Sequence, residues 1–157
     1  MLKCRTQDFT DLDVRYARDN SRERCTLELE ELTGRIIRCA MTVHSTLGSG
    51  FIESVYQKAL AFELARAGID FECEKPLVVI YEGIVVGEFS ADMVIEGAII
   101  VENKAVARLT PVHEVQLVNY LTATGLDIGL LLNFGAQSLD FRRKTRVFKL
   151  PRTLEEE

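Results

Sequence analysis

The sequence has no hydrophobic run long enough to cross a membrane. Its longest continuous apolar stretches, such as residues 128–132, fall far short of the roughly 20 residues that a membrane-spanning helix requires. A positively charged segment followed by an apolar one is also missing from the first residues, so we expect no signal peptide. These absences predict a protein that has no membrane partner.

Cysteine is scarce, and its spacing does not fit the usual thiolate zinc motifs. No Cys-x-x-Cys pair occurs, and neither histidine, His44 or His113, lies at zinc-finger spacing from a cysteine. The pattern is typical of reduced thiols in a cytoplasmic protein. The four cysteines are Cys4, Cys25, Cys39 and Cys73.

Positive charge is in deficit as well. The chain has 19 Lys and Arg residues against 24 Asp and Glu residues, which gives a formal net charge of -5. Taken alone, this value argues against a nucleic-acid-binding protein, because phosphate recognition usually relies on a basic surface. The sum hides an asymmetry, since residues 142–152 carry six basic side chains and the remainder of the chain therefore carries -11.

The composition is that of one ordinary globular domain. The chain has 157 residues, of which 47% are hydrophobic and 27% charged, and this size and balance fit a single folded unit. Residues 1–26 mix charges of both signs without periodicity, which predicts a poorly ordered, variable leader. We expect the folded domain to span 27–150, followed by an acidic tail at 151–157.

Hydrophobic periodicity predicts an α/β fold with a central mixed sheet flanked by helices. Apolar residues recur at helical spacing in the first two elements, and three strand-like segments then follow one another through short turns. A proline at the first helical position opens a third helix, and a continuous apolar run predicts a strand buried on both faces. The expected elements, in the order α-α-β-β-β-α-β-β, are 27–47, 51–67, 71–80, 84–95, 98–106, 110–124, 128–134 and 139–150.

The third predicted strand carries the sharpest chemical signal. Glu102 and Lys104 are two positions apart on a segment that is otherwise apolar, so they project from the same face of the strand. A short hairpin places residues whose numbers sum to about 193 or 194 opposite each other, which brings Asp92 next to Glu102. Charged groups on a half-buried strand are costly unless they are paired or bind a ligand.

Two carboxylates and a lysine in this pattern suit a divalent cation such as Mg²⁺ or Mn²⁺. The lysine would orient a water or stabilise charge developing on a phosphate. The alternative interpretation of the Glu-x-Lys spacing is a surface ion pair, which contributes less than about 1 kcal/mol. In that case Asp92 would lie far from Glu102 and no acidic pocket would form.

Two helices carry further candidate residues. Glu53 and Tyr56 are three positions apart on the second helix, and Gln116 and Tyr120 are four apart on the third, so each pair is expected to share a helix face. If both helices pack on the same sheet, Glu53, Gln116 and Tyr120 can border the site. The alternative roles are structural, with both tyrosines as packing residues, Gln116 as an ordinary helix residue, His113 bonded to the backbone and His44 in a structural position.

These residues together resemble the GxxExxY proteins, a small bacterial and archaeal group placed in the PD-(D/E)xK nuclease superfamily. The resemblance runs from about residue 29 to residue 147 and includes the signature Gly50-x-x-Glu53-x-x-Tyr56. It also includes Ala91-Asp92, Glu102-x-Lys104 and a stretch from Leu109 to Leu121. One departure is Asn103, where many relatives have an apolar residue.

The resemblance implies a restriction-endonuclease-like fold, a site and a substrate. Asp92 and Glu102 would bind Mg²⁺ (or Mn²⁺), Glu53 would complete the acidic set, and Lys104 would assist the attacking water. Gln116 and Tyr120 are similar to a glutamine and tyrosine pair of exonuclease-like members. Superfamily members often dimerise, so a homodimer is an expectation as well.

The first hypothesis is therefore a nuclease that hydrolyses phosphodiester bonds in DNA or RNA. The competing hypothesis is a catalytically weak or inactive nuclease-fold module that acts through a nucleic-acid or protein partner. In the first case the basic stretch near the C-terminus would contact phosphates, although lysine and arginine also protect the exposed edge of a sheet. The predicted contact residues are Arg142, Arg143, Lys144 and Arg146.

Overall fold

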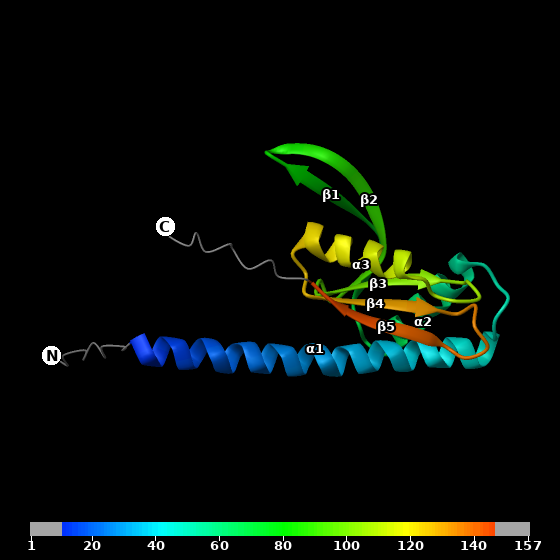
Figure 1. Ribbon diagram of the computed structural model, residues 1–157. Coiled ribbons are helices and arrows are strands. Elements are labelled where there is room, and N and C mark those ends of the chain that lie inside the picture. Colours follow the sequence, from blue (N-terminus) through cyan, green and yellow to red (C-terminus); the bar gives the residue numbers. More distant parts are fainter. Residues whose placement is uncertain (1–10, 147–157) are drawn as a thin grey trace.

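The computed structural model describes the backbone of residues 11–146 and the side chains of residues 25–146 (Figure 1). Eight elements follow one another in the predicted order α-α-β-β-β-α-β-β. None of the described helices is long and apolar enough to span a membrane. The elements are α1 (Asp11–Leu47), α2 (Glu53–Arg66), β1 (Phe71–Tyr81), β2 (Ile84–Ile95), β3 (Ile99–Lys104), α3 (Pro111–Thr124), β4 (Ile128–Asn133) and β5 (Asp140–Thr145).

The five strands form one mixed sheet in the order β1-β2-β3-β4-β5. Only β3 and β4 are parallel, and the crossover between them contains α3. Helices α1 and α2 cover one face of the sheet and α3 covers the other (Figure 1). This arrangement is the predicted α/β architecture, with a central mixed sheet between helical layers.

Two apolar clusters hold the layers together, one on each face of the sheet. Ile99 and Val101 of β3 pack with α1 and α2, whereas Ile100 packs with α3, because successive side chains of a strand point to opposite faces. All six residues of β4 are buried. The apolar run over this segment therefore correctly predicts a strand covered on both sides.

Helix α1 and strand β5 differ in extent from the sequence prediction. The helix begins at Asp11, whereas periodicity predicts it from residue 27, so part of the segment expected to be a leader has helical backbone. Strand β5 covers Asp140–Thr145, and residues 147–150 of the predicted 139–150 lie outside the described residues. Residues 1–10 of the leader and the acidic tail at 151–157 lie outside the described residues.

The hairpin of β2 and β3 has the predicted register. Met93 pairs with Val101 and Ile95 with Ile99, so paired residue numbers sum to 194. The connecting loop has positive φ angles at Glu96 (51°) and Gly97 (61°), the left-handed conformation that tight hairpin loops require. No pairing continues beyond Met93, where β2 separates from β3.

Beyond this separation, β1 and β2 continue together as a two-stranded ribbon. Residues 76–90, here called the hairpin arm, leave the body of the sheet and curve over α3 (Figure 1). The pairing contains an irregularity between Val79 and Ile80, the position of a β-bulge. The predicted site residues Asp92 and Glu102 therefore lie where the arm leaves the sheet.

Candidate functional site

The structure brings Asp92 and Glu102 together at the point where β2 and β3 separate. The backbone N–H of Asp92 donates to Glu102 Oε1 over 3.2 Å, and the backbone N–H of Asn103 donates to Asp92 Oδ2 over 2.7 Å. Each carboxylate thus accepts a hydrogen bond from the opposite strand, in place of the ladder hydrogen bonds that end at Met93. The juxtaposition inferred from the hairpin register is present.

The environment of this pair raises the pKa of both carboxyl groups. Glu102 is only 3% exposed, and burial, followed by the nearby charge of Asp92, raises its pKa to about 7. Burial also raises the pKa of Asp92, against the opposing effects of the Asn103 N–H and of Lys104. A buried and a half-buried carboxyl group that repel each other form a site at which added positive charge is favourable.

Lys104 and Glu53 have opposite effects on the pKa values of Asp92 and Glu102. Lys104 ends β3, two residues after Glu102, and its charge lowers the pKa of both carboxyl groups. Glu53 is exposed in the first turn of α2, and its charge raises both pKa values. Glu53 lines the same depression as Asp92, although the described residues contain no group of three acidic, histidine or cysteine side chains close enough to hold an ion together.

An open depression of about 720 Å³ borders Asp92. It lies between the start of α2, the loop before it and the start of the arm. Its wall contains the carboxylates of Glu53, Glu74 and Asp92 and no basic side chain. The residues that line it are Gly50, Phe51, Ile52, Glu53, Ser54, Gln57, Glu74, Asp92 and Ala105.

Sequence reasoning misses two residues of this depression, Gln57 and Glu74. Gln57 Nε2 donates to Glu74 Oε1 over 2.8 Å and to the backbone oxygen of Asp92 over 3.2 Å, so it joins α2 to both strands. Its position four residues after Glu53, on the same helix face, is a signal that could have identified it. Glu74 has a positive φ of 50° at an irregular position of β1, which strand alternation does not predict.

Tyr56 has a structural role and does not line the depression. It is fully buried and stacks on Phe134 with 4.7 Å between the ring centroids. Its hydroxyl donates to the oxygen of Gly48 over 2.7 Å and accepts from the N–H of Phe51 over 3.1 Å. Although Glu53 precedes it by only three residues, Tyr56 points into the core and fixes the loop that leads to Glu53.

Gln116 and Tyr120 are held together on α3. Gln116 Nε2 donates to the Tyr120 hydroxyl over 3.0 Å, and the Tyr120 ring packs on Phe89 of the arm at 5.8 Å. Both residues line a second depression, between α3 and the arm. Within the described residues, their side-chain hydrogen bonds connect them to each other and not to Asp92 or Glu102.

The two histidines occupy structural positions, as expected. His44 is buried, its Nε2 lies 3.0 Å from the oxygen of Ala136, and its ring stacks on Phe134. His113 Nδ1 accepts a hydrogen bond from the backbone N–H of Thr110 at the start of α3. Neither ring lines the depression at Asp92.

The four basic residues predicted to contact nucleic acid all take part in ion pairs. On the α3 side of β5, Arg142 pairs with Asp140 at 2.6 Å and Lys144 pairs with Glu114. The remaining pairs are Arg143 with Glu30 at 3.5 Å and Arg146 with Asp127 at 2.9 Å. Strand β5 is an edge strand separated from β3 by β4, so these cations do not adjoin Asp92 and Glu102, and their contact with phosphates remains a prediction.

The donor atoms present at Asp92 and Glu102 suit a hard cation. Both are carboxylates, and the added charge of Glu53 and Glu74 makes the surroundings negative. Mg²⁺ is usually held by one or two carboxylates and keeps several of its waters. The pair therefore fits Mg²⁺ or Mn²⁺, whereas an ion that requires a complete cage of protein ligands does not fit.

None of the curated protein sequences matches this chain. The crystal structure of SSO0001 is similar to it, with 18% sequence identity and a TM-score of 0.49, over 61% of this chain and 50% of that one. The chain thus spans about half the length of that protein. A family model described as the PD-(D/E)XK nuclease superfamily matches residues 30–144, well over half of the sequence. The chain belongs to the PD-(D/E)XK nuclease superfamily.

Proposed function

We propose that this protein is a divalent-metal-dependent nuclease that hydrolyses phosphodiester bonds in DNA or RNA. The observation that carries the proposal is the meeting of Asp92 and Glu102 at the separation of β2 and β3, with Lys104 on the same strand as Glu102. Membership of the nuclease superfamily supports it. The arrangement provides the oxygen ligands of two carboxylates and the positive charge of one lysine at a single site.

Each side chain has a role that follows from its place in the site. Asp92 and Glu102 would hold Mg²⁺ or Mn²⁺, and Glu53 would orient a water from the start of α2. When bound, the ion polarises a phosphoryl oxygen and lowers the pKa of a coordinated water. The ammonium group of Lys104 stabilises the negative charge that develops on the phosphate. Gln116 and Tyr120, held together by a hydrogen bond, would position the substrate from α3.

The acidity of the depression gives the metal a second task. Glu53, Glu74 and Asp92 line it and no basic side chain does, so a phosphodiester backbone is disfavoured there in the absence of a metal ion. Substrate affinity should therefore depend on the metal and be local to the site. If substrate binding depends on the metal ion in this way, the net charge of -5 is compatible with a nucleic-acid substrate.

Within the superfamily, we assign the chain to the GxxExxY group. The signature residues have distinct tasks that support the assignment. Gly50 has a φ of 118°, a conformation that favours glycine, and Tyr56 fixes the loop through Gly48 and Phe51. Glu53 is left exposed towards Asp92 and Glu102.

The proposed nuclease domain is 27–150, with 1–26 and 151–157 as additions to it. The family match over residues 30–144 falls inside these bounds.

Phosphate contact by β5 is also proposed, and it requires that ion pairs such as Arg143 with Glu30 open when substrate binds. Because exposed ion pairs of this kind contribute about 1 kcal/mol or less, their exchange for a phosphate is not costly.

The direct test is cleavage of labelled DNA and RNA by the wild-type protein and by Lys104→Ala, with Mg²⁺ or Mn²⁺ present. We expect metal-dependent cleavage by the wild-type protein and at least a ~100-fold lower rate for the variant, because charge stabilisation at the transition state is typically of this size. Lys58→Ala is a matched control, since this exposed lysine of α2 is not part of the site. Equal rates for wild type and Lys104→Ala would remove the assignment.

A non-catalytic binding module is the second candidate. The observation that favours it is the ion pairing of all four predicted phosphate-contacting residues of the C-terminal segment. Such a module would bind Mg²⁺ at Asp92 and Glu102 but cleave no labelled DNA or RNA. Calorimetric metal binding without turnover would therefore select it over the nuclease.

A further inference from the structure

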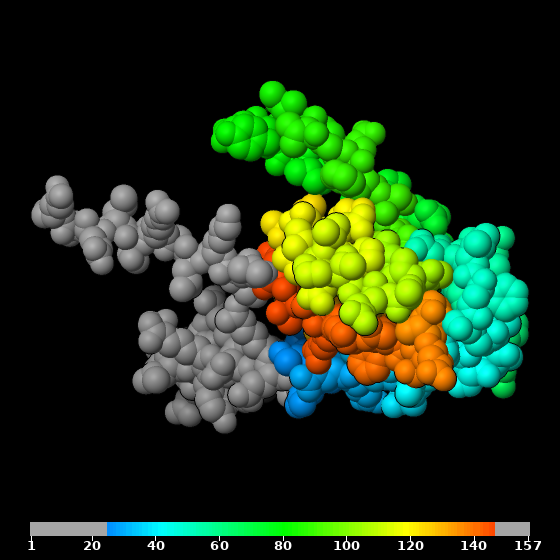
Figure 2. Space-filling model, turned by 45° about the vertical axis from the view of Figure 1, so that its right-hand side comes forward, coloured from blue at the N-terminus to red at the C-terminus, as the bar shows by residue number. Residues whose placement is uncertain are grey.

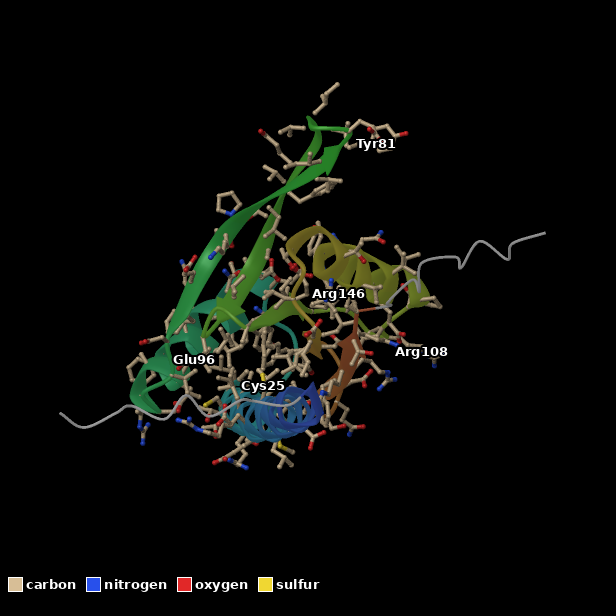
Figure 3. The ribbon with its side chains drawn as sticks, turned by 90° about the vertical axis from the view of Figure 1, so that its left-hand side faces the viewer. Cys25, Tyr81, Glu96, Arg108 and Arg146 are labelled. Carbon is tan, nitrogen blue, oxygen red and sulfur yellow. The ribbon has the colours of Figure 1, made fainter. Side chains whose placement is uncertain are left out.

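The hairpin arm, residues 76–90, is unusually apolar for an exposed segment. It carries seven of the large hydrophobic side chains that are exposed among the described residues, each between 46% and 68% accessible: Val78, Ile80, Tyr81, Ile84, Val85, Val86 and Phe89. Figure 2 shows the arm standing away from the body above α3, and Figure 3 places Tyr81 at its tip. A contiguous apolar surface of this kind marks an interaction site, whereas scattered apolar residues do not.

The strand register puts apolar side chains on both faces of the arm. Leu77 pairs with Phe89, and Phe89 packs towards α3 on Tyr120. Ile80 pairs with Val85, and both project away from that inner face, because residues opposite each other in an antiparallel pair share a face and alternate along the strand. Helix α3 can cover only one face, and a two-stranded ribbon alone is marginally stable in water.

An apolar groove lies beneath the arm. It has a volume of about 240 Å³, and Val79 and Phe89 of the arm face Val112 and Val115 of α3 across it. Both α3 valines are more than half exposed. The molecule thus has an apolar arm and, beside it, an apolar groove that its own arm does not fill (Figure 2).

The charge of the arm argues against nucleic acid as the partner of its apolar surface. Residues 76–90 contain no Lys or Arg and carry two acidic residues, Glu82 and Glu88, whereas a nucleic-acid groove needs cations along the backbone path. A second copy of the chain provides an arm of the same apolar chemistry. The seven arm side chains and the two α3 valines expose several hundred Å² of apolar surface, on the order of the ~800 Å² per partner of a stable interface.

We propose that the hairpin arm is a dimerisation element. Outer-face side chains of one arm, such as Ile80 and Val85, enter the groove between the arm and α3 of a second copy, and the second arm does the same in return. This exchange is two-fold symmetric, so each copy contributes the same surface and the interface closes. It covers both faces of the arm, one with its own α3 and the other with the partner. The proposal does not rest on the nuclease activity, but the groove is also lined by Gln116 and Tyr120, the pair proposed to position the substrate.

The test is the mass of the full chain in solution, measured by light scattering after size exclusion at about 100 μM, a concentration at which a standard-size interface is occupied. We expect twice the chain mass of 17.7 kDa for the wild type. The double variant Ile80→Glu with Ile84→Glu should give the single-chain mass, with an unchanged circular dichroism spectrum because both side chains are exposed. Phe62→Ser is the matched control, since Phe62 is 65% exposed on α2, and it should remain dimeric.

Three results would overturn the proposal. A wild-type protein of single-chain mass at this concentration would show that the arm does not join two copies, and a dimer that persists in the double variant would place the interface elsewhere. A monomeric wild type that sediments with phosphatidylcholine vesicles, or shifts labelled DNA, through an interaction lost in the double variant would assign the arm to lipid or nucleic acid instead.

Discussion

Glu102 illustrates how the surroundings of one residue set its chemistry. Its carboxyl group is 3% exposed and lies against that of Asp92, and together these effects raise its pKa from 4.5 to about 7. The sequence predicts this meeting, because the loop at Glu96 and Gly97 fixes the hairpin register. It does not predict Gln57 and Glu74, because the hydrogen bonds of Gln57 to Glu74 and to the backbone of Asp92 depend on the packing of α2, and Glu74 has a positive φ of 50° within β1.

The raised pKa of Glu102 predicts a pH-dependent stability. Between about pH 4.5 and pH 7 the folded protein binds more protons than the unfolded chain, so the free energy of unfolding falls as the pH rises through this window. From about pH 5 to pH 8 this loss should be on the order of 2 kcal/mol. Urea unfolding of the wild type and of Glu102→Gln at both pH values measures it.

Glu102→Gln serves as the comparison because it keeps the size of the side chain and removes its titration. The variant should lose much less stability than the wild type over the same pH range. Asp92, whose pKa is also raised, contributes in the same direction in both proteins. Identical pH dependence in the two proteins would show that Glu102 titrates normally in the folded state.

The elements were largely predictable because most of them begin and end at strong local signals. Pro111 opens α3, and Gly125 ends it with a φ of 74°. The two strands of the hairpin arm were predicted, but their exposure was not, because the apolar run from Ile84 to Val86 is typical of a buried strand. In the structure these residues are more than half exposed. We propose that a second copy of the chain buries these side chains, and the sequence of a single chain does not indicate such a contact.

The loop before α2 depends on the hydroxyl of Tyr56. Tyr56→Phe removes the donor to Gly48 and the acceptor for Phe51, which should lower the free energy of unfolding by about 1 kcal/mol. Tyr81→Phe is the control, because Tyr81 is exposed and its variant should stay within about 0.5 kcal/mol of the wild type. Equal effects of the two substitutions in urea unfolding would argue against this role of Tyr56.

The close approach of α3 to β4 depends on Gly129. A Cβ at this position would lie 2.7 Å from the buried side chain of Leu117, so Gly129→Ala should destabilise the fold by about 1–3 kcal/mol through overpacking. Gly34→Ala should do the opposite. It lies within α1 with its nearest neighbour at 3.7 Å, and alanine favours a helix over glycine by about 0.5–1 kcal/mol.

Thermal or urea unfolding of both glycine variants gives the sign of each change. Opposite signs are the expected result, because Gly129 is required by packing and Gly34 is not. A stabilising Gly129→Ala would mean that Leu117 moves aside without cost and that the contact between α3 and β4 is loose.

At the scale of the whole molecule, the charges are arranged so that the net value conceals two regions. Acidic side chains gather around Asp92 and Glu102, whereas the basic residues of β5 lie on the far edge of the sheet and are paired with carboxylates such as Glu30 and Glu114. The sequence indicates this asymmetry, but it does not indicate the pairing. Under the proposed function, a bound cation would therefore be the main route by which a phosphodiester approaches the site.

Calorimetric titration of Mg²⁺ at about pH 8, where Glu102 is largely ionised, tests the central claim most directly. The wild type should bind the ion at one site, and Asp92→Asn and Glu102→Gln should each weaken binding at least ~10-fold, because each removes one of two charged ligands. Lys104→Ala should bind as tightly or more tightly, since it removes a neighbouring positive charge. A wild type that binds no Mg²⁺, or an Asp92→Asn variant that binds it equally well, would contradict the account.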